Sequence, residues 1–523
     1  MRRFNVAGLC VTSKHYMVDI SGKIDKIMEL IDYGDYFTIN RARQYGKTTT
    51  LNLLEKRLEV DFICASISFE GLGDRDFESA EAFCPRFLRL ISRAVGLTSA
   101  PGDYAEGWIN DDATEFVPLG DHITKMCKDR KVVLMIDEVD RTSDNRVFLH
   151  MLGMLRAKYL AAQAGKDHTF HSVILAGVYD IKNTKLKMIN EGSYAPTASE
   201  GGIYNSPWNI AVDFEVDMSF NPAEISTMLN DYEADHHTGM NITQIADGIH
   251  FFTNGYPFLV SRICKHIDEK LDREWSYGGI QSAVKILLAE NNTLFDDISK
   301  NLNNSKELYD FMYSVLINGE AVNYVAGDPL IDLGAIYGLL MNVDGKAVVS
   351  NKIFEIRMTD YYISVESRNS RKKKIDRVVQ YDVVKDGRLD MELCLRKFAE
   401  HYAELFTERD SEFLEKHGKL LFLIYLKPLI NGQGFYHLES QLADLRRMDI
   451  VVDFGSDQFI VELKLWRGES GHEDALEQLL GYMDSKNASA GYLLTFDLRK
   501  NERRQPGAKW LAYGDKRVFD VIV

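Results

Sequence analysis

The segment 40–50, Asn-Arg-Ala-Arg-Gln-Tyr-Gly-Lys-Thr-Thr-Thr, constrains the fold of this chain more than any other. The apolar run Tyr36–Ile39 precedes it and predicts a short buried strand, and leucines at helical spacing follow it. A phosphate-binding loop requires this order of strand, tight loop and helix, because backbone N–H groups and the positive helix end must face an anion. The segment therefore predicts a nucleotide-binding site.

The residues expected to bind the nucleotide surround the start of that helix: Arg43, Gln44, Tyr45, Gly46, Lys47, Thr48 and Thr49. Lys47 is expected to reach the β- and γ-phosphates of ATP, and the Thr48 hydroxyl to bind Mg²⁺. The usual pattern is G-x-x-x-x-G-K-[S/T], and Arg41 stands at its first glycine. Taken alone, the segment also fits an ordinary helix start with a solvated lysine.

A second segment, Lys131–Glu138, supports the nucleotide interpretation. Its apolar run ends in two carboxylates, as in a buried parallel strand that delivers acids at its carboxyl end. Asp137 is expected to hold Mg²⁺, and Glu138 to orient or deprotonate the attacking water. A structural strand ending in an acidic turn is the alternative for this segment alone.

Length and composition set the outer limits. A chain of 523 residues is too long to fold around a single hydrophobic core, so several domains are expected. The net charge of −16 argues against a protein that coats DNA indiscriminately. The six cysteines are scattered without a C-x-x-C pair, which favours buried thiols in a reducing compartment. We found neither a signal peptide nor a membrane-spanning stretch, so a cytoplasmic location and no membrane partner are expected.

Apolar strands alternate with helices over residues 1–275 and predict an α/β domain with a doubly wound parallel sheet. A helix is expected at Tyr16–Ile31 and a strand at Trp208–Phe214. Tyr179-Asp180, after the strand His171–Val178, is the expected place of a γ-phosphate sensor. Gly255-Tyr256-Pro257 opens a helix and predicts either a lid over the nucleotide or a plain helix start with proline in its first turn.

Residues 276–366 contain short helices and two strand-like segments, Ala347–Ser350 and Phe354–Arg357, which suit a small winged-helix-like domain. The basic run Ser367–Lys374 marks a linker over 367–380. This run can contact nucleic-acid phosphates, although a solvated linker is the simpler interpretation. A second basic stretch covers Arg499–Lys509.

The C-terminal region, 381–523, contains two alternating runs, Arg447–Asp453 and Gln458–Leu465, around a turn with glycine. They predict a β-hairpin with Asp449 opposite Glu462. Lys464 then shares the face of Glu462, because side chains repeat every second residue. Opposed carboxylates repel, and a divalent cation between them relieves the repulsion. A solvated amphipathic hairpin is an equal alternative.

Further residues surround this hairpin. Glu439 precedes it and is a third candidate metal ligand. The segment Glu473–Tyr482 predicts a helix with Gln478 and Tyr482 on one face. A strand, Ala490–Phe496, follows and gives an α-β-β-β-α-β order.

These motifs resemble two known families. Residues 16–50 and 132–140 resemble the prokaryotic AAA-ATPase-like family, whose loop reads Arg-Pro-Arg-x-x-Gly-Lys-[Ser/Thr]; Ala42 replaces the proline. Asp449, Glu462-x-Lys464, Gln478 and Tyr482 resemble the PD-(D/E)XK nuclease domain often fused to this ATPase, with Met448 at the proline position. The resemblance implies a P-loop NTPase sheet with a helical lid and a C-terminal α/β restriction-endonuclease-like domain.

The resemblance implies a metal-dependent phosphodiesterase carried by an ATP-driven switch. Asp449 and Glu462 would bind Mg²⁺ or Mn²⁺, and Lys464 would orient the water; Gln478 belongs to the same catalytic set. Nucleic acid, with DNA favoured, is the expected partner, and homo-oligomerisation stays open. Defence against foreign DNA and nucleic-acid processing are the roles that the architecture suggests.

Two other functions stay open. One is a nucleotide-dependent signalling or scaffold protein whose nuclease-like domain binds DNA or a partner without cutting. The other is a nucleotide switch that barely hydrolyses ATP, against which Glu138 argues.

Overall fold

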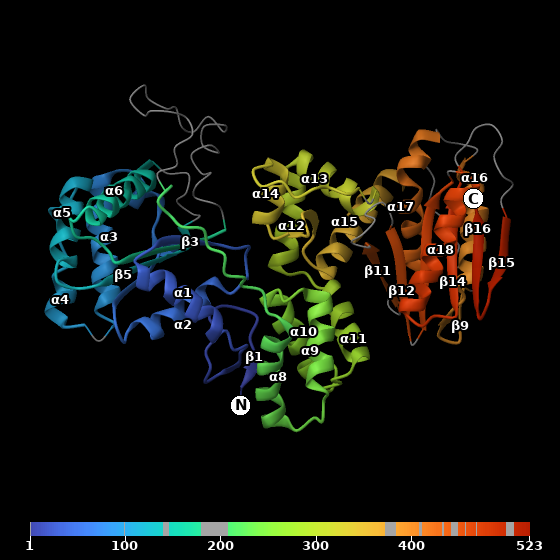
Figure 1. Cartoon of the computed structure of the whole chain (residues 1–523), viewed down its shortest axis with the longest axis horizontal. Coiled ribbons are helices and arrows are strands. Elements are labelled where there is room, and N and C mark those ends of the chain that lie inside the picture. The colour runs from blue at the N-terminus through green and yellow to red at the C-terminus, as the bar shows by residue number, and fades with distance from the viewer. Residues whose placement is uncertain are drawn as a thin grey trace. The chain divides into compact units, whose positions relative to one another are not determined.

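The structure is a computed structural model. It describes residues 2–98, 100–139, 146–178, 208–318, 320–371, 383–406, 411–430, 434–440, 448–455, 457–466, 468–497 and 507–523. The chain forms two compact units, one of residues 1–283 with 336–338, the other of residues 284–335 with 339–523 (Figure 1). The division into domains 1–275, 276–366, 367–380 and 381–523 stays a prediction.

A four-stranded parallel sheet forms the centre of the first unit, in the order β3-β6-β5-β4. Its strands are β3 (Tyr36–Asn40), β4 (Ile63–Ser68), β5 (Val132–Asp137) and β6 (Ser172–Gly177). Every residue of β5 and β6 is buried, as expected for strands covered on both faces. The parallel α/β sheet predicted from the sequence is confirmed.

Helices cover both faces of this sheet. Alternate strand residues such as Ala65, Leu134 and Val173 pack with helices on one face into a single core. The helices of this unit before the lid are α1 (Ser21–Tyr33), α2 (Lys47–Leu58), α3 (Ala80–Val95), α4 (Gly102–Glu106), α5 (Phe116–Cys127) and α6 (Arg146–Gln163). Short 3₁₀ turns η1 (Phe69–Gly71) and η2 (Asp74–Phe77) precede α3.

A group of helices, which we call the lid after the sequence prediction, follows the sheet in the chain. It consists of α8 (Pro222–His236), α9 (Ile242–Thr253) and α10 (Pro257–Lys270), and α11 (Tyr277–Leu288) comes next. The short parallel strands β1 (Arg3–Phe4) and β2 (His15–Tyr16) bring the N-terminal residues to this lid, where Phe4 stacks on Tyr232 with ring centroids 5.1 Å apart.

One expected element of the first unit is wrong, and another is confirmed with a later start. Trp208–Phe214 forms a turn and one parallel bridge, Val212 to Phe37, in place of a strand. Its aromatic residues are packing anchors, since buried Trp208 stacks on Tyr36. The expected helix at Tyr16 begins only at Ser21, because buried Tyr16 belongs to β2.

The second unit begins with a helical part. Its elements are α12 (Thr293–Asn304), α13 (Lys306–Tyr313), the π-helical turn η4 (Ser314–Asn318), α14 (Pro329–Ile336), the hairpin β7 (Leu340–Val343) with β8 (Lys346–Val349), and α15 (Lys352–Arg371). The strand expected at Ala347–Ser350 is confirmed as β8. A winged-helix-like identity stays a prediction.

The strand expected at Phe354–Arg357 is wrong, because these residues lie in α15. The Asn351 side chain accepts a hydrogen bond from the Phe354 backbone at 2.9 Å and starts the helix. Buried Phe354, Met358 and Tyr362 then follow at the four-residue spacing of a helix face. The same helix continues to Arg371, so the described part of the basic run is helical, while 372–380 lies outside the described residues.

A six-stranded sheet in the order β11-β12-β13-β14-β16-β15 forms the rest of the second unit. Its strands are β11 (Gly434–Ser440), β12 (Met448–Phe454), β13 (Asp457–Leu465), β14 (Ala490–Phe496), β15 (Gly507–Tyr513) and β16 (Lys516–Ile522). The predicted hairpin is β12 with β13, and the expected pair Asp449–Glu462 is confirmed, with Asp453 opposite Gln458 near the turn.

Helices lie on both faces of this sheet as well. The helix α18 (Glu469–Ser485) packs on Val451, Ile460 and Leu493 and lies in front of the sheet in Figure 1. The helices α16 (Met391–Phe406) and α17 (Ser411–Ile430) precede the sheet, as does the small pair β9 (Val384–Lys385) with β10 (Arg388–Leu389). Within the described residues, no helix has the length and apolarity to cross a bilayer.

Candidate functional site

The loop between β3 and α2 is a tight turn that leads directly into the N-terminus of α2. Gly46 caps α2 with φ of 82°, a left-handed conformation that glycine adopts without the strain of a side chain. Gln44 also has a positive φ, 57°. The helix therefore starts at Lys47, as the sequence predicted, with its first N–H groups at the loop.

Lys47 folds back over this loop. Its Nζ donates hydrogen bonds to the carbonyl oxygens of Arg41 at 2.9 Å and Ala42 at 3.1 Å, and the residue is only 8% exposed. An ammonium group held against the loop is already placed to meet an anion cradled there. The expectation of a solvated lysine at a plain helix start is thus wrong.

Thr48 and Asp137 meet across the end of the sheet. The Thr48 hydroxyl donates a hydrogen bond to Asp137 Oδ2 at 2.7 Å, and the carboxylate is 7% exposed. A hydroxyl and a carboxylate so close form the oxygen donor set that Mg²⁺ prefers beside phosphates. The two sequence segments therefore converge on one site, although their strands are separated in the sheet by β6.

Glu138 leaves the end of β5 in a strained conformation. Its φ is 57°, uncommon for a residue with a side chain, and its backbone N–H donates to Asp137 Oδ1 at 2.9 Å. This bond occupies the second oxygen of Asp137 and fixes its orientation. The expected sensor, Tyr179-Asp180, lies outside the described residues.

Arg41, at the position of the usual first glycine, fastens the loop to the segment that leads to the lid. Its guanidinium donates to the carbonyl oxygens of Asn40 at 2.8 Å and Val216 at 2.9 Å and lies 5.5 Å from the ring of Phe214. Burial lowers the pKa of Arg41. The arginine therefore has a structural role at this position that the sequence alone did not reveal.

The lid contacts the loop through the start of α10. The Tyr256 hydroxyl donates a hydrogen bond to the Arg43 carbonyl, and the Tyr256 ring packs edge-on against Tyr45 with centroids 4.7 Å apart. Gly255 has φ of 71°, and a Cβ there would lie 2.0 Å from the Phe220 carbonyl oxygen. Pro257 stands in the first turn of α10, as a plain helix start predicts, and the same segment brings Tyr256 to the phosphate-binding loop. A lid over the nucleotide stays a prediction.

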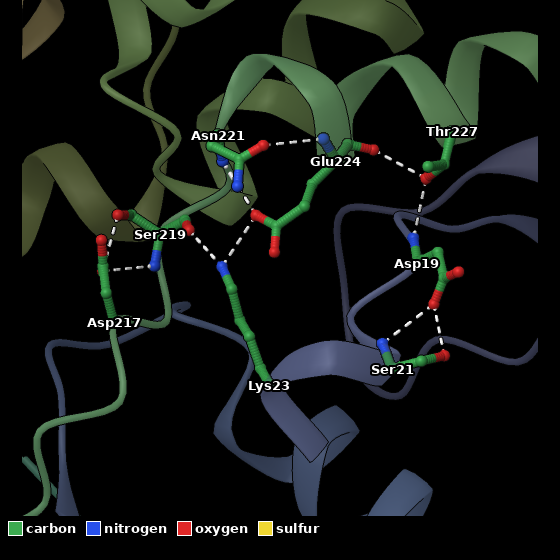
Figure 2. A network of polar contacts seen from close by, with 8 residues as sticks. All are labelled: Asp19, Ser21, Lys23, Asp217, Ser219, Asn221, Glu224 and Thr227. Carbon is green, nitrogen blue, oxygen red and sulfur yellow. Dashed lines mark hydrogen bonds and ion pairs between the residues drawn. The ribbon is translucent and has the colours of Figure 1, made fainter. Parts of the chain in front are cut away.

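A network of polar contacts joins α1 to the first lid helix (Figure 2). Lys23 Nζ pairs with Glu224 Oε2 at 2.8 Å and donates to the Ser219 carbonyl. Glu224 Oε2 also accepts from the Asn221 backbone N–H at 2.9 Å, and Asn221 Oδ1 accepts from the Glu224 backbone N–H at 2.9 Å. The backbone of Asp19 donates to Thr227 Oγ1 at 2.9 Å. Helix α8 is therefore attached directly to the α1 side of the sheet.

Thr49, another predicted nucleotide-binding residue, accepts a hydrogen bond at Oγ1 from the Cys10 backbone at 3.3 Å. This contact brings the N-terminal segment to the first turn of α2. Arg43 and Gln44 are exposed at the tip of the loop. Their predicted contacts with nucleotide are not tested.

Comparison with known families supports the interpretation of this site. The profile of the AAA-like domain family matches residues 7–355, more than half of the 523 residues. The chain belongs to the AAA-like domain family. The matched range contains the loop, the Asp137 strand and the lid, so the first unit is a P-loop ATPase-like AAA domain.

Solved structures give more distant similarities. The Walker-type ATPase paby2304 of Pyrococcus abyssi is 12% identical, with 68% of this chain and 99% of that chain covered and a TM-score of 0.47. The Aeropyrum pernix ORC2 protein, in ADPNP-ADP complexes, is 11% identical, with 66% and 93% covered and a TM-score of 0.34. Cdc6p from Pyrobaculum aerophilum is 13% identical, with 68% and 94% covered and a TM-score of 0.31. Similarities at this level carry no argument about activity. No curated protein matches the chain.

Outside the AAA-like domain, a second polar site lies on the face of the C-terminal sheet that α18 covers. Lys464 Nζ pairs with Glu462 Oε1 at 2.8 Å and lies 3.4 Å from Gln478 Oε1 on α18. Glu462 is 1% exposed. The structure thus brings together three of the four predicted catalytic residues of this region.

The remaining predicted residues of this site are placed by their backbone. The strand register sets Asp449 opposite Glu462 and Glu439 opposite Asp449. The side chains of Asp449 and Glu439 lie outside the described part of the structure. Among described side chains, no group of three His, Cys, Asp or Glu residues could hold a metal ion. Tyr482 is buried in the core between α18 and the sheet. Metal binding at this second site stays a prediction.

The most important residues that sequence reasoning missed are Arg41, which joins the loop to the segment before the lid, and Tyr256, which joins the lid to the loop. Arg41 donates to the Val216 carbonyl and Tyr256 to the Arg43 carbonyl. Because every residue has a backbone carbonyl, the identity of the acceptor residue gives no signal in the sequence. The Gly-x-Pro segment was the one usable signal. Residues 372–374 of the first basic run and 499–506 of the second lie outside the described residues.

Proposed function

We propose that this AAA-like protein binds and hydrolyses ATP with Mg²⁺ and thereby controls a metal-dependent nuclease in its C-terminal region, with DNA as the favoured substrate. The contact of Thr48 with Asp137 carries the ATPase part, because it unites the phosphate-binding loop with a carboxylate from another strand. Homo-oligomerisation and a cytoplasmic location remain sequence-based expectations.

In this proposal each residue of the loop has a defined task. Lys47 moves its ammonium group from the carbonyls of Arg41 and Ala42 to the β- and γ-phosphates. Thr48 and Asp137 would hold Mg²⁺, which supplies charge neutralisation on the phosphates when bound. Glu138 orients the attacking water and accepts its proton. The strained backbone at Glu138 fits a residue whose position is set by function.

ATP turnover by the purified chain tests this part. Glu138→Gln is expected to keep ATP binding and to lower kcat by roughly 100-fold or more, because general-base catalysis contributes roughly 10²–10⁴-fold. Lys47→Ala is expected to lose binding. Glu106→Gln, a change of an exposed acid at the end of α4, is the matched control and should leave kcat unchanged. Turnover by Glu138→Gln at the wild-type rate would refute the assigned role.

The nuclease part rests on the Glu462–Lys464–Gln478 group. Lys464 is fixed by Glu462 and Gln478, so that its ammonium group can orient a water molecule and stabilise charge on a phosphate. Glu462 and Asp449, which the register places opposite each other, would provide carboxylates for Mg²⁺ or Mn²⁺, with Glu439 as a third ligand. Such a metal polarises the phosphate and activates water.

Cleavage of plasmid and single-stranded DNA tests this part, with Mg²⁺ or Mn²⁺ and with or without ATP. Metal-dependent cutting is expected in the wild type, to be lost in Lys464→Ala and retained in Lys385→Ala, a change of an exposed lysine in the same unit. Lys47→Ala then reports whether ATP controls cutting. The nuclease proposal fails if ATP is hydrolysed but no DNA is cut.

A second function has one observation in its favour. Lys464 already neutralises Glu462 through a direct ion pair, so this buried carboxylate is stable without a metal. A nucleotide-dependent scaffold, whose nuclease-like domain binds DNA or a partner without cutting, would need a stable ion pair at this position but no metal. ATP-dependent retention of DNA without cleavage would favour the scaffold.

A further inference from the structure

A cavity of about 490 Å³ lies inside the second unit. Its walls come from the end of α11, from α15, from the end of α17 and from the first residues of β11. Cavities of roughly 300–1,000 Å³ are typical of small-molecule sites. The cavity shares no residue with the two sites described above.

Positive charge dominates the lining. Lys285, Arg357 and Lys427 line the cavity together with one carboxylate, Asp360. Lys427 Nζ pairs with Asp360 Oδ1 at 2.5 Å, and the Tyr436 hydroxyl donates to the same oxygen at 3.0 Å. The charge of Asp360 is therefore compensated within the lining, which keeps a net charge of two positive units. An anion is the ligand that this surface favours.

The two further cations are held in place by the protein. Arg357 donates to the Leu288 carbonyl at 3.3 Å and lies 4.9 Å from the ring of Phe295. Lys285 Nζ lies 5.5 Å from the ring of Phe435. Burial lowers the pKa of Lys285, although Asp453 opposes this effect. An anion nearby would favour the charged lysine, so ligand binding and lysine protonation reinforce each other.

The rest of the lining is apolar and aromatic. Phe435 and Tyr436 are buried, and Tyr361 and Ile356 add further carbon surface. Burial, followed by the field of Asp360, raises the pKa of Tyr436, so its hydroxyl stays protonated and keeps its bond to Asp360. Aromatic surface beside cations suits a ligand with a planar ring at one end and phosphate at the other.

We propose that this cavity binds a nucleoside 5′-phosphate, with the phosphate at Arg357 and Lys285 and the base against the aromatic wall. The ligand is a free nucleotide or the phosphorylated 5′ end of a nucleic-acid strand, which share this chemistry. The site is independent of the ATPase and nuclease proposals. Binding measurements alone therefore test it.

The test is calorimetric titration of the full chain carrying Lys47→Ala, which removes the phosphate-binding lysine of the AAA-like domain. The probes are the 5′-monophosphates of adenosine, guanosine, cytidine and uridine, with adenosine and inorganic phosphate for comparison. One site per chain is expected for at least one monophosphate. Adenosine and inorganic phosphate are expected to bind at least tenfold more weakly, because each offers only one part of the ligand.

Two substitutions in this background locate the site. Lys285→Gln and Arg357→Gln are each expected to raise Kd by roughly tenfold or more, the loss for one charge-assisted hydrogen bond. Lys300→Gln changes an exposed lysine of α12 outside the lining and should leave Kd unchanged. Lys285→Gln keeps the test decisive if Arg357→Gln does not fold, since Arg357 also holds the Leu288 carbonyl.

A pair of ten-nucleotide DNA strands separates the two sources. Tighter binding of the 5′-phosphorylated strand than of the 5′-hydroxyl strand, lost in Lys285→Gln, assigns the site to a nucleic-acid end. Binding of mononucleotides alone assigns it to a free nucleotide. The proposal is overturned if no monophosphate binds, if inorganic phosphate binds as tightly, or if Kd is unchanged in Lys285→Gln.

Discussion

Removal of one hydroxyl, in Tyr256→Phe, tests whether the lid supports the phosphate-binding loop. The hydroxyl donates to the Arg43 carbonyl, whereas the ring contact with Tyr45 survives in phenylalanine. A neutral hydrogen bond contributes about 0.5–1.5 kcal/mol, which corresponds to roughly a 2–12-fold change in an equilibrium constant. We expect KM for ATP to rise by this factor, because fewer molecules hold the loop in its binding conformation.

The assay is steady-state ATP turnover, with thermal unfolding to confirm the fold. Tyr232→Phe is the matched control, because it removes a hydroxyl that donates to Asp268 at 2.6 Å within the lid. Both variants should lose stability, but only Tyr256→Phe should change KM. Equal KM values in wild type and Tyr256→Phe, with the fold intact, would refute the reasoning.

Two further predictions concern stability. Glu224→Ala should lower the free energy of unfolding by about 2–4 kcal/mol, since it removes both an ion pair and a capping bond. In thermal unfolding, Lys23→Met should lower this free energy by less, and Lys26→Met, at an exposed lysine, should leave it unchanged. Burial lowers the pKa of His122 and of His171, so on acidification the unfolded chain takes up these protons at a higher pH than the folded chain does. Stability should therefore fall from pH 7.5 to 5.5, and less steeply in His122→Gln; an unchanged slope would contradict this assignment.

The parts of the fold that local rules determine were predictable from the sequence. The helix start at Lys47 follows from a glycine that alone accepts φ of 82° without strain. The pairing of Asp449 with Glu462 follows from a short turn and a two-residue repeat, since a shift by one residue would turn every side chain to the other face. Both predictions needed only neighbours in the chain.

Predictions failed where a short apolar run fits more than one structure. Phe354–Arg357 contains enough large residues for a strand, but its neighbours continue the spacing of a helix face through Tyr362. Trp208–Phe214 has strand composition, but its aromatic residues pack on Tyr36 and Phe37 from a turn. Tertiary packing decided both cases, and no pattern within the run encodes it.

The contacts that connect loop and lid were beyond prediction because they end on backbone oxygens. Arg41 reaches Val216, 175 residues away, and Tyr256 reaches Arg43, 213 residues away, each at a carbonyl that any residue would supply. Lys47 adds bonds to the Arg41 and Ala42 carbonyls. A phosphate that attracts the Lys47 ammonium group would break its bonds to the carbonyls of Arg41 and Ala42. The same loop also contacts Val216, before the lid, and Tyr256, in the lid. We therefore expect loop and lid to respond to nucleotide together, and Tyr256→Phe measures how strongly.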